Sequence, residues 1–286
     1  MALRLSLVSL ALLAALAGAA SAAAVGDADV AALQVALHGQ KLYGGTIDGL
    51  LGPRTDGALR AFQRRSGVPD TGQVGPLTRA ALGASARPAL GSRLLRKGRS
   101  GWDVSALQFL LAWRGFPSGP FDGVFGDRVE AALLAFQEWA GVPMTGQAGS
   151  LTLAALRAPL PRSPLRLSWP LVAPVGDGFG PRGDRFHSGI DLPAPSGTPV
   201  GAAGVGVVVE AGWHDGGFGN QVVVDHGSGV TSRYDHLSRV DVTVGRIIEA
   251  GDRIGLVGAT GHATGPHLHF EVRVRGAAVD PLTALT

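Results

Sequence analysis

Residues 267–274 read His-Leu-His-Phe-Glu-Val-Arg-Val, with polar and apolar side chains in strict alternation. A period of two predicts a β-strand that turns one face toward a hydrophobic core. His267 and His269 then share the other face, with their backbones roughly 6.5–7 Å apart. Imidazoles at that spacing can converge on one small site. One ring can bind a metal ion directly, at about 2.0–2.1 Å for zinc, while its neighbour stands beside the ion.

The region around this strand predicts a domain built mostly of antiparallel β-strands. Seven of the eight histidines lie between His187 and His269. Valine triplets at 207–209 and 222–224 indicate strand cores, and glycine-rich turns separate them. Because no long amphipathic helix follows residue 165, we expect one β domain over residues 165–286.

A second cluster, His187-Ser-Gly-Ile-Asp191, offers partners for the strand histidines. In a straight strand, residues four apart lie about 13 Å from each other, too far for one ion. A bend at Gly189 would bring them together, so we expect His187 in a loop and Asp191 at the start of a strand. The chain has no cysteine, so a metal site must use His, Asp or Glu. Two histidines and a carboxylate suit zinc with an open coordination position, which favours hydrolysis.

The N-terminal half repeats itself at an offset of 74 residues. Leu33-Gln34 returns as Leu107-Gln108, and 107 − 33 = 74. The same offset relates four further pairs of motifs: Asp48-Gly49 and Asp122-Gly123, Ala61-Phe62-Gln63 and Ala135-Phe136-Gln137, Gly67-Val68-Pro69 and Gly141-Val142-Pro143, Thr71-Gly72-Gln73 and Thr145-Gly146-Gln147. No gap is needed through Leu82 and Leu156, which indicates the duplication of one unit.

Each unit is predicted to form a small bundle of three helices. In the first unit, Val30, Leu33 and Leu37 recur at helical spacing. Residues 54–65 carry an apolar face and predict a second helix, and residues 78–82 predict a short third one. The second unit repeats this pattern.

The overall composition excludes several classes of protein. The 286 residues carry 25 Lys and Arg against 22 Asp and Glu, and a net charge of +3 is too small to indicate a nucleic-acid partner. With 45% hydrophobic and 16% charged residues, the chain is not intrinsically disordered. The 44 glycines and 18 prolines have no triplet period, which excludes collagen and indicates many turns.

The first residues predict a secretory signal peptide over residues 1–24. Arg4 precedes a mostly apolar run from Leu5 to Ala17, and Ala20-Ser21-Ala22 fits a small-x-small cleavage site. An uncleaved anchor is the alternative, because residues 5–24 are almost long enough to span a bilayer. We expect cleavage, no membrane contact afterwards, and a secreted or cell-envelope location, in the periplasm or the wall.

The repeated motifs resemble the peptidoglycan-binding module found, often in tandem, on bacterial wall hydrolases. The resemblance covers about residues 28–83 and 93–158, and it implies two three-helix domains that dock on peptidoglycan. Trp113 and Trp139 occur only in the second unit. They could stack on sugars, but packing is the favoured interpretation. The proline-rich segment from Pro159 to Pro170 predicts a stiff spacer between these domains and the next one.

The C-terminal domain strongly resembles the lysostaphin-type (M23) zinc endopeptidases of bacterial walls. Three stretches carry the resemblance in the right order: His-Ser-Gly-Ile-Asp at 187–191, Tyr-Asp-His-Leu at 234–237, and Gly-Pro-His-Leu-His-Phe-Glu at 265–271. It implies a peptidase domain over residues 165–286 with one zinc ion.

The resemblance also implies a role for each matching position. His187, Asp191 and His269 match the zinc ligands, and His236 and His267 match the two catalytic histidines. In such a site zinc supplies the attacking water, while the catalytic histidines orient it, shuttle its proton and stabilise the oxyanion. How the two histidines divide the acid and base roles is left open.

The sequence thus predicts a multidomain protein, with two small all-α domains followed by a mostly antiparallel β domain. We expect a secreted zinc endopeptidase that hydrolyses stem or cross-bridge peptides of peptidoglycan. The alternatives are a catalytically inactive wall-binding or hydrolase-activator protein and a wall esterase or amidase. Deleting residues 28–158 should weaken wall association more than cleavage of a small soluble peptide.

Three acidic residues and three further histidines have no predicted role in the chemistry. Asp184, Asp235 and Glu271 are interpreted as surface groups or as partners that orient a zinc histidine. His214 and His262 are placed in glycine-rich loops where they line the groove at most, and His226 in a turn.

Overall fold

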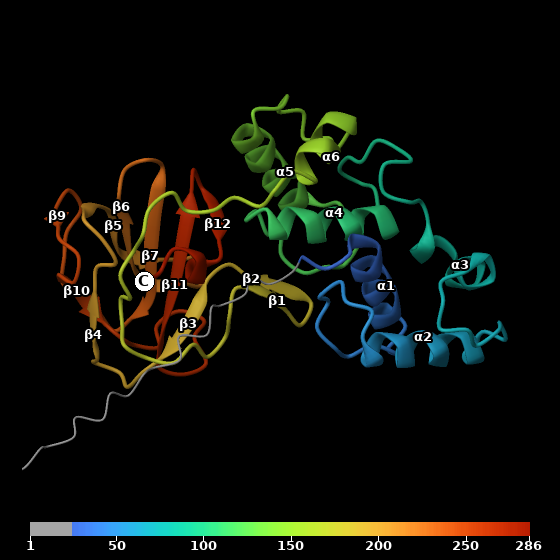
Figure 1. The fold of residues 1–286 in the computed structure, drawn as a ribbon, viewed down its shortest axis with the longest axis horizontal. Coiled ribbons are helices and arrows are strands. Elements are labelled where there is room, and N and C mark those ends of the chain that lie inside the picture. The colour runs from blue at the N-terminus through green and yellow to red at the C-terminus, as the bar shows by residue number, and fades with distance from the viewer. Residues whose placement is uncertain (1–24) are drawn as a thin grey trace, which may run out of the picture.

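The computed structural model describes residues 25–286, so the predicted leader at residues 1–24 lies outside the described residues. A helical N-terminal half is followed by a β-rich C-terminal half, which confirms the predicted fold class (Figure 1). Within residues 25–286, no helix is long and apolar enough to cross a membrane.

The helices of the two repeat units follow the 74-residue offset. Unit 1 comprises α1 (Ala28–Gly39), α2 (Pro53–Arg65) and α3 (Pro76–Leu82), with a 3-10 turn at Gly83–Ala86. Unit 2 comprises α4 (Trp102–Trp113), α5 (Asp127–Ala140) and α6 (Ser150–Leu156). All six helices begin at equivalent positions, and only α5 runs one residue longer than its counterpart. The prediction of three helices in each unit is confirmed.

A pair of buried glutamines holds the turns of each unit. Gln34 receives a hydrogen bond from Gly49 N at 2.9 Å and donates to the carboxylate of Asp48 at 2.7 Å. Its counterpart Gln108 bonds Gly123 N and the carboxylate of Asp122, each at 2.8 Å. Buried polar groups of this kind are stable only when paired, which explains why Leu-Gln and Asp-Gly recur together.

The second glutamine of each unit does the same for the turn before the third helix. Gln63 accepts from Gly72 N at 3.0 Å and donates to Gln73 O at 2.9 Å. In unit 2 the corresponding bonds join Gln137 to Gly146 N at 3.0 Å and to Gln147 O at 2.9 Å. These bonds account for the recurring Ala-Phe-Gln and Thr-Gly-Gln motifs.

The two units share a hydrophobic core, so they are not independent domains joined only by a linker. The equivalent helices α1 and α4 pack against each other, and one apolar cluster extends from Leu33 and Phe62 of unit 1 to Phe109 of unit 2. Trp102, which is 1% exposed, donates its indole N–H across the contact to Asp29 at 2.7 Å.

The C-terminal half consists of antiparallel sheets. The main sheet has seven strands, which run in the order β12, β11, β7, β6, β5, β9, and β3 also pairs with β11. Its strands are β3 (Ile190–Pro193), β5 (Gly206–His214), β6 (Gly219–Asp225), β7 (Val230–Leu237), β9 (Ile247–Ile248), β11 (His267–Val274) and β12 (Ala277–Val279). The smaller sheets are formed by β4 (Pro199–Gly201), β10 (Arg253–Leu256) and β8 (Arg239–Val240), and by the hairpin β1 (Gly180–Arg182) and β2 (Arg185–His187). The bounds of β11 match the predicted strand, and Leu268, Phe270 and Val272 lie in the core.

The helical half packs directly on the β half. Trp139 of α5 donates its indole N–H to Val274 O at 3.1 Å, and Ala278 N of β12 donates to Gly115 O at 3.2 Å. The segment from Pro159 to Pro170 has no helix or strand, as expected, but it does not act as a spacer. Leu160 packs against the core of the helical half, and Leu167 forms a β-bridge with Leu285.

Candidate active site

Strand pairing brings the predicted metal ligands together. His187 ends β2 and Asp191 lies in β3, so His187 is at the end of a short strand rather than in the expected loop. Asp191 stands directly opposite His269 in the pairing of β3 with β11. The chain turns between β2 and β3 at Gly189, where a Cβ atom would come within 2.3 Å of Phe270 O, so only glycine fits.

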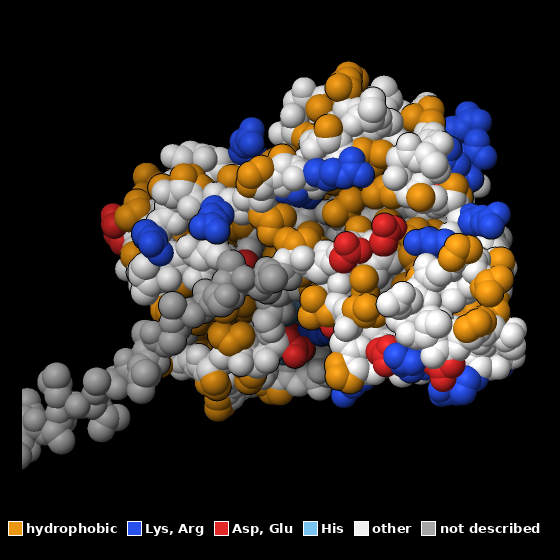
Figure 2. All heavy atoms as spheres, turned by 45° about the vertical axis from the view of Figure 1, so that its right-hand side comes forward, with side chains coloured by type: hydrophobic (Ala, Val, Ile, Leu, Met, Phe, Trp, Pro, Cys, Tyr) orange, Lys and Arg blue, Asp and Glu red, His pale blue; other side chains and the backbone are white. Residues whose placement is uncertain are grey.

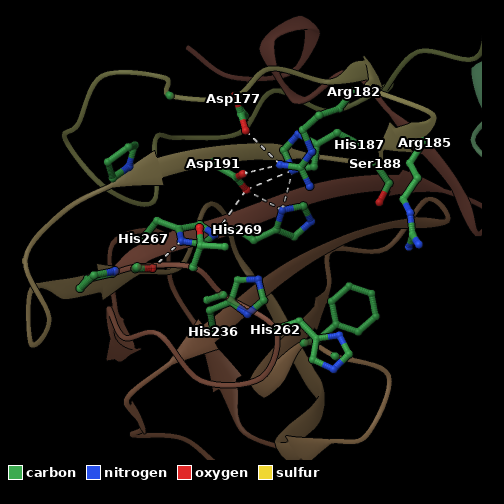
Figure 3. A pocket seen from close by; sticks show the side chains of 18 of the residues that line it. Asp177, Arg182, Arg185, His187, Ser188, Asp191, His236, His262, His267 and His269 are labelled. Atoms are coloured by element: carbon green, nitrogen blue, oxygen red, sulfur yellow. Dashed lines mark hydrogen bonds and ion pairs between the residues drawn. The ribbon is translucent and has the colours of Figure 1, made fainter. Parts of the chain in front are cut away.

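The three side chains offer one ligand atom each to a common point (Figure 3). Nε2 of His187 lies 3.1 Å from Oδ1 of Asp191 and 3.0 Å from Nδ1 of His269. The same carboxylate oxygen lies 2.8 Å from Nδ1 of His269, and all three ligand atoms are within 4.8 Å of one another.

The outer contacts of the two rings determine which nitrogens face inward. Nδ1 of His187 donates to Gly178 O at 2.8 Å, and Nε2 of His269 faces a carboxylate oxygen of Glu271 at 3.3 Å. In the neutral rings the inner nitrogens then carry lone pairs that point at each other and at Asp191. Three acceptors facing one point require a cation between them, so these residues fit a zinc ion.

The ionisation of the cluster agrees with a cation site. Burial opposes a charge on His269, but hydrogen bonds with Asp191 and Glu271 outweigh it and raise the pKa of His269 to about 9. Burial would raise the pKa of Asp191, yet its contacts with His187 and His269 hold that pKa well below the usual range. A proton therefore neutralises the cluster when no metal is bound, and a metal ion would displace it.

The two predicted catalytic histidines lie beside the cluster. The ring of His267 is centred 4.9 Å from that of His236, and its Nε2 lies 3.7 Å from Oδ1 of Asp191. Nδ1 of His267 bonds Gly265 O and Nδ1 of His236 bonds Thr260 O, each at 2.8 Å. Both rings therefore keep Nε2 free to accept a proton.

The environment of His236 suits a proton acceptor. Burial, reinforced by the neighbouring histidines, lowers the pKa of His236 to about 4, which keeps the ring neutral at pH 7. His236 also has a left-handed backbone, with φ of +66°, which few non-glycine residues adopt. The bond from its N–H to Phe218 O at 2.9 Å helps to hold this strained conformation.

A groove of about 1010 Å³ opens over these side chains. Its walls are formed by three segments of the C-terminal half, at residues 176–193, 216–218 and 262–269, together with His236. Among the described residues, none from the N-terminal half lines the groove. The helical half therefore packs beside the groove without covering it.

The acidic residues near the site differ from one another. Glu271 is fully buried, receives hydrogen bonds from Ser188 and from Arg273, and faces Nε2 of His269, so it orients that ring rather than lying at the surface. Asp235 is also fully buried, and within residues 25–286 its carboxylate has no hydrogen-bond partner. Burial raises the pKa of Asp235 to about 7. Asp184 is exposed, as expected.

The remaining histidines of the C-terminal half lie outside the predicted metal and catalytic set, but His214 is the last residue of strand β5 rather than part of the expected loop. His262 lines the groove, whereas His214 does not and accepts a bond from Gly216 N. His226 is held between Val205 O and the Ser232 hydroxyl, away from the site.

Sequence reasoning missed two arginines of the groove. Arg182 and Arg185 line it from the hairpin β1–β2, and Arg182 donates to Asp191 Oδ2 at 3.1 Å. They carry no recognised motif. The available signal was the turn Gly183-Asp184 between two arginines, just ahead of His187.

Comparison with known proteins agrees with this geometry. The model of Peptidase family M23 matches residues 185–281, and the model described as "Putative peptidoglycan binding domain" matches residues 26–82 and 100–156. DD-carboxypeptidase/endopeptidase Mpg of Neisseria meningitidis is 46% identical over 35% of this chain and 23% of its own length. Peptidoglycan DD-endopeptidase ShyA of Vibrio cholerae is 48% identical over 34% of this chain and 23% of its own length.

Among solved structures, the catalytic domain of lysostaphin from Staphylococcus simulans is 39% identical over 38% of this chain and 90% of that one, with a TM-score of 0.37. That score is too low to support an assignment by shape, so the family rests on the sequence matches. The chain spans about a quarter of the length of the curated relatives. It contains a peptidase family M23 domain, preceded by two domains of the peptidoglycan-binding family.

Proposed function

We propose that this chain is a zinc-dependent endopeptidase that hydrolyses peptide bonds in bacterial peptidoglycan. The observation that carries the proposal is the convergence of His187, Asp191 and His269 within 4.8 Å at the groove, beside two histidines with a free Nε2. The family match supports the reaction class, and the two peptidoglycan-binding-family domains support the substrate.

The roles of the residues follow from their contacts. His187, Asp191 and His269 would hold one zinc ion, with Glu271 orienting His269. When bound, zinc activates water and polarises a carbonyl. His236 and His267 take the proton from the attacking water, pass it to the leaving amine, and stabilise the negative charge that develops on the scissile carbonyl oxygen.

The proposal includes the predicted domain limits and location. The leader at residues 1–24 would direct export and be removed, and the units at 28–83 and 93–158 would hold the domain at 165–286 on the wall. Because all five site positions are intact, an inactive activator protein is the weaker alternative.

Mass spectrometry of purified peptidoglycan digested by the protein tests this function. We expect new amino groups within stem or bridge peptides, their loss with a chelator, and their return with added zinc. New ends on the glycan strands only, or products that are insensitive to chelation, would contradict the proposal.

Two variants separate metal binding from catalysis. His269→Ala should lose stoichiometric zinc, whereas His236→Ala should keep zinc and lose about 10²–10⁴-fold in kcat. His214→Ala is the matched control, because His214 lies outside the groove. Zinc retained by His269→Ala would refute that ligand assignment.

A further inference from the structure

The hairpin β1–β2 separates the groove from the helical half and has a different role on each face. Successive side chains of a strand point to opposite faces. In β2, Arg185 and His187 therefore share one face, and Phe186 between them points the other way. Arg182 stands directly opposite Arg185 in the hairpin, so it shares the groove face with His187.

The groove face places two arginines side by side. Like charges directly opposite each other on a hairpin destabilise it unless each is paired with an opposite charge. An arginine of such a pair that has no acidic partner in the protein is therefore a candidate to bind a negatively charged ligand. Arg182 is compensated, since it donates to Asp177 Oδ2 at 3.0 Å and to Asp191 Oδ2 at 3.1 Å. The side chain of Arg185 has no hydrogen bond or ion pair with any residue of the described chain, and Figure 3 shows it at the pocket with no dashed line to a neighbour.

The opposite face of the hairpin is held by unit 2. Phe186 and Phe179 lie edge to face, with ring centroids 5.0 Å apart. The ring of Trp113, at the end of α4, packs against both, at 5.3 Å from Phe186 and 6.4 Å from Phe179. Trp113 is 5% exposed, so the sequence-based preference for packing over sugar stacking agrees with its place in this cluster.

The tip of the hairpin is held by both units at equivalent positions. Ile47 N donates to Gly183 O at 2.8 Å, and Phe121 N donates to Asp184 O at 2.7 Å. Residues 47 and 121 are separated by the repeat offset of 74. The duplication thus supplies two matching backbone donors to two adjacent carbonyls of one turn.

We propose that Arg185 is a specificity-determining residue that binds a carboxylate of the substrate, and that the two repeat units hold the hairpin in place for it. This inference rests on the proposed peptidase function. Arginine suits the role because its guanidinium can form paired hydrogen bonds with a carboxylate. Stem peptides of peptidoglycan carry such free carboxylates, and a hairpin fixed at its back and tip presents the charge in a constant position.

A pair of matched substrates tests the first part. One is a purified cross-linked stem-peptide dimer with free carboxylates, and the other is the same dimer with those groups converted to primary amides. We expect the wild-type protein to prefer the carboxylate form by about 10- to 100-fold in kcat/KM, mainly through KM. Arg185→Gln should abolish the preference, and Arg185→Lys should restore part of it.

The control is Arg246→Gln, which changes an exposed arginine away from the groove and should keep the preference. If Arg185→Gln discriminates between the dimers as the wild type does, or if the wild type cleaves both equally, the inference is wrong while the peptidase function stands. If the wild type cleaves neither the dimers nor intact peptidoglycan, the function itself fails.

Variants of the contact between Trp113 and Phe179 test whether the repeat units hold the hairpin in place, and they are made in the full chain. Trp113→Ala and Phe179→Leu should each lower the carboxylate preference toward the Arg185→Gln value, with zinc content unchanged. Trp113→Phe keeps a ring against Phe179 and should restore the preference. Leu151→Ala, at a 64% exposed position of α6 in the same unit, is the matched control. Full preference in Phe179→Leu and in folded Trp113→Ala would overturn the role of the units.

Discussion

The two repeat units share the hydrogen bonds of their buried glutamines but have different surroundings. Where unit 2 has Trp113, Gly115 and Trp139, unit 1 has Gly39, Lys41 and Arg65 at the positions 74 residues earlier. The three residues of unit 2 contact the peptidase domain, and their three counterparts in unit 1 are exposed. The buried glutamines, by contrast, make matching bonds in both units.

This difference indicates that the two copies have different roles, with unit 2 making the contacts to the C-terminal domain that the equivalent residues of unit 1 do not make. The glutamine-centred turns define the fold of a unit, so both copies retain them. Unit 2 uses its surface to dock on the peptidase domain, which leaves the equivalent surface of unit 1 free for another contact. Figure 2 shows Lys and Arg side chains scattered over the face of the molecule that it draws rather than gathered in one patch. A purely electrostatic attraction to the wall is therefore not favoured on this face.

The largest effect should come from exchanging the residues at positions 41 and 115. Both have a left-handed backbone, with φ of +58° for Lys41 and +85° for Gly115. A Cβ atom at Gly115 would lie 2.3 Å from Ala278 O and 2.4 Å from Ala278 N, which are backbone atoms that cannot rotate away. Gly115→Lys should therefore cost about 3 kcal/mol of unfolding free energy, measured by urea unfolding.

The reverse exchange is the control. Lys41 is exposed in unit 1, so Lys41→Gly should change stability by less than about 0.5 kcal/mol. Gly115→Lys should also make the segment from Pro159 to Pro170 sensitive to protease, because undocking exposes it. Equal effects of the two exchanges would contradict the difference in surroundings.

Replacing the buried glutamines should affect both units alike. Gln63→Leu leaves Gly72 N and Gln73 O without their partner, and Gln137→Leu does the same to Gly146 N and Gln147 O. Each change should cost about 2–3 kcal/mol in urea unfolding, since buried polar groups are left unpaired. A much smaller loss in unit 2 would mean that docking, rather than its glutamine, holds that unit together.

Local periodicity explains how much of this architecture the sequence could predict. The alternation over residues 267–274 specifies β11, and an ungapped repeat specifies helices that begin at equivalent positions. The motifs around His187 and His269 predict that these two side chains meet. The geometry of their meeting depends on the strand pairing of Asp191 with His269, which are 78 positions apart, and local periodicity does not specify that pairing.

Local periodicity could not predict how the helical half docks on the β half. Trp113 packs on Phe179 and Phe186, and no periodic pattern connects those segments. The composition of the proline-rich segment predicts a spacer, because it specifies an extended backbone but not what that backbone lies against. Trp113 and Trp139 were the one hint, since large aromatic residues present in only one copy indicate a contact that the other copy lacks.

A smaller effect should follow from the polar part of the docking contact. Trp139→Phe keeps an aromatic ring near Phe116 and Phe136 but removes the N–H donated to Val274 O. We expect a loss of about 1 kcal/mol in urea unfolding. Arg65→Ala, at the equivalent exposed position of unit 1, should change stability by less than about 0.5 kcal/mol. A larger loss for Arg65→Ala than for Trp139→Phe would reverse the assignment of the docking unit.

The smallest effect should come from an ion-pair cluster that only unit 1 has. Asp70 accepts hydrogen bonds from Arg64 at 2.6 Å and Arg60 at 3.3 Å, whereas the equivalent residues of unit 2 are Met144, Glu138 and Leu134. The hydrogen bond from Arg64 is the main cause that lowers the pKa of Asp70 in the folded protein. The unfolded chain therefore binds a proton more readily, so this stabilisation is present above the unfolded pKa of about 3.9 and is lost as the pH falls through the lower folded value.

Asp70→Asn should slightly lower the thermal midpoint at pH 7. The difference from wild type should shrink as the pH falls from 4 toward 2, because Asp70 becomes protonated, and it should shrink in 1 M salt, because the cluster is exposed and screened. Met144→Ala, a 56% exposed position in unit 2, should show no such dependence on pH or salt. A difference between Asp70→Asn and wild type that persists unchanged at pH 2 would mean that Asp70 acts through packing. The ion pairs of Asp70 with Arg60 and Arg64 would then not distinguish the stability of the two units.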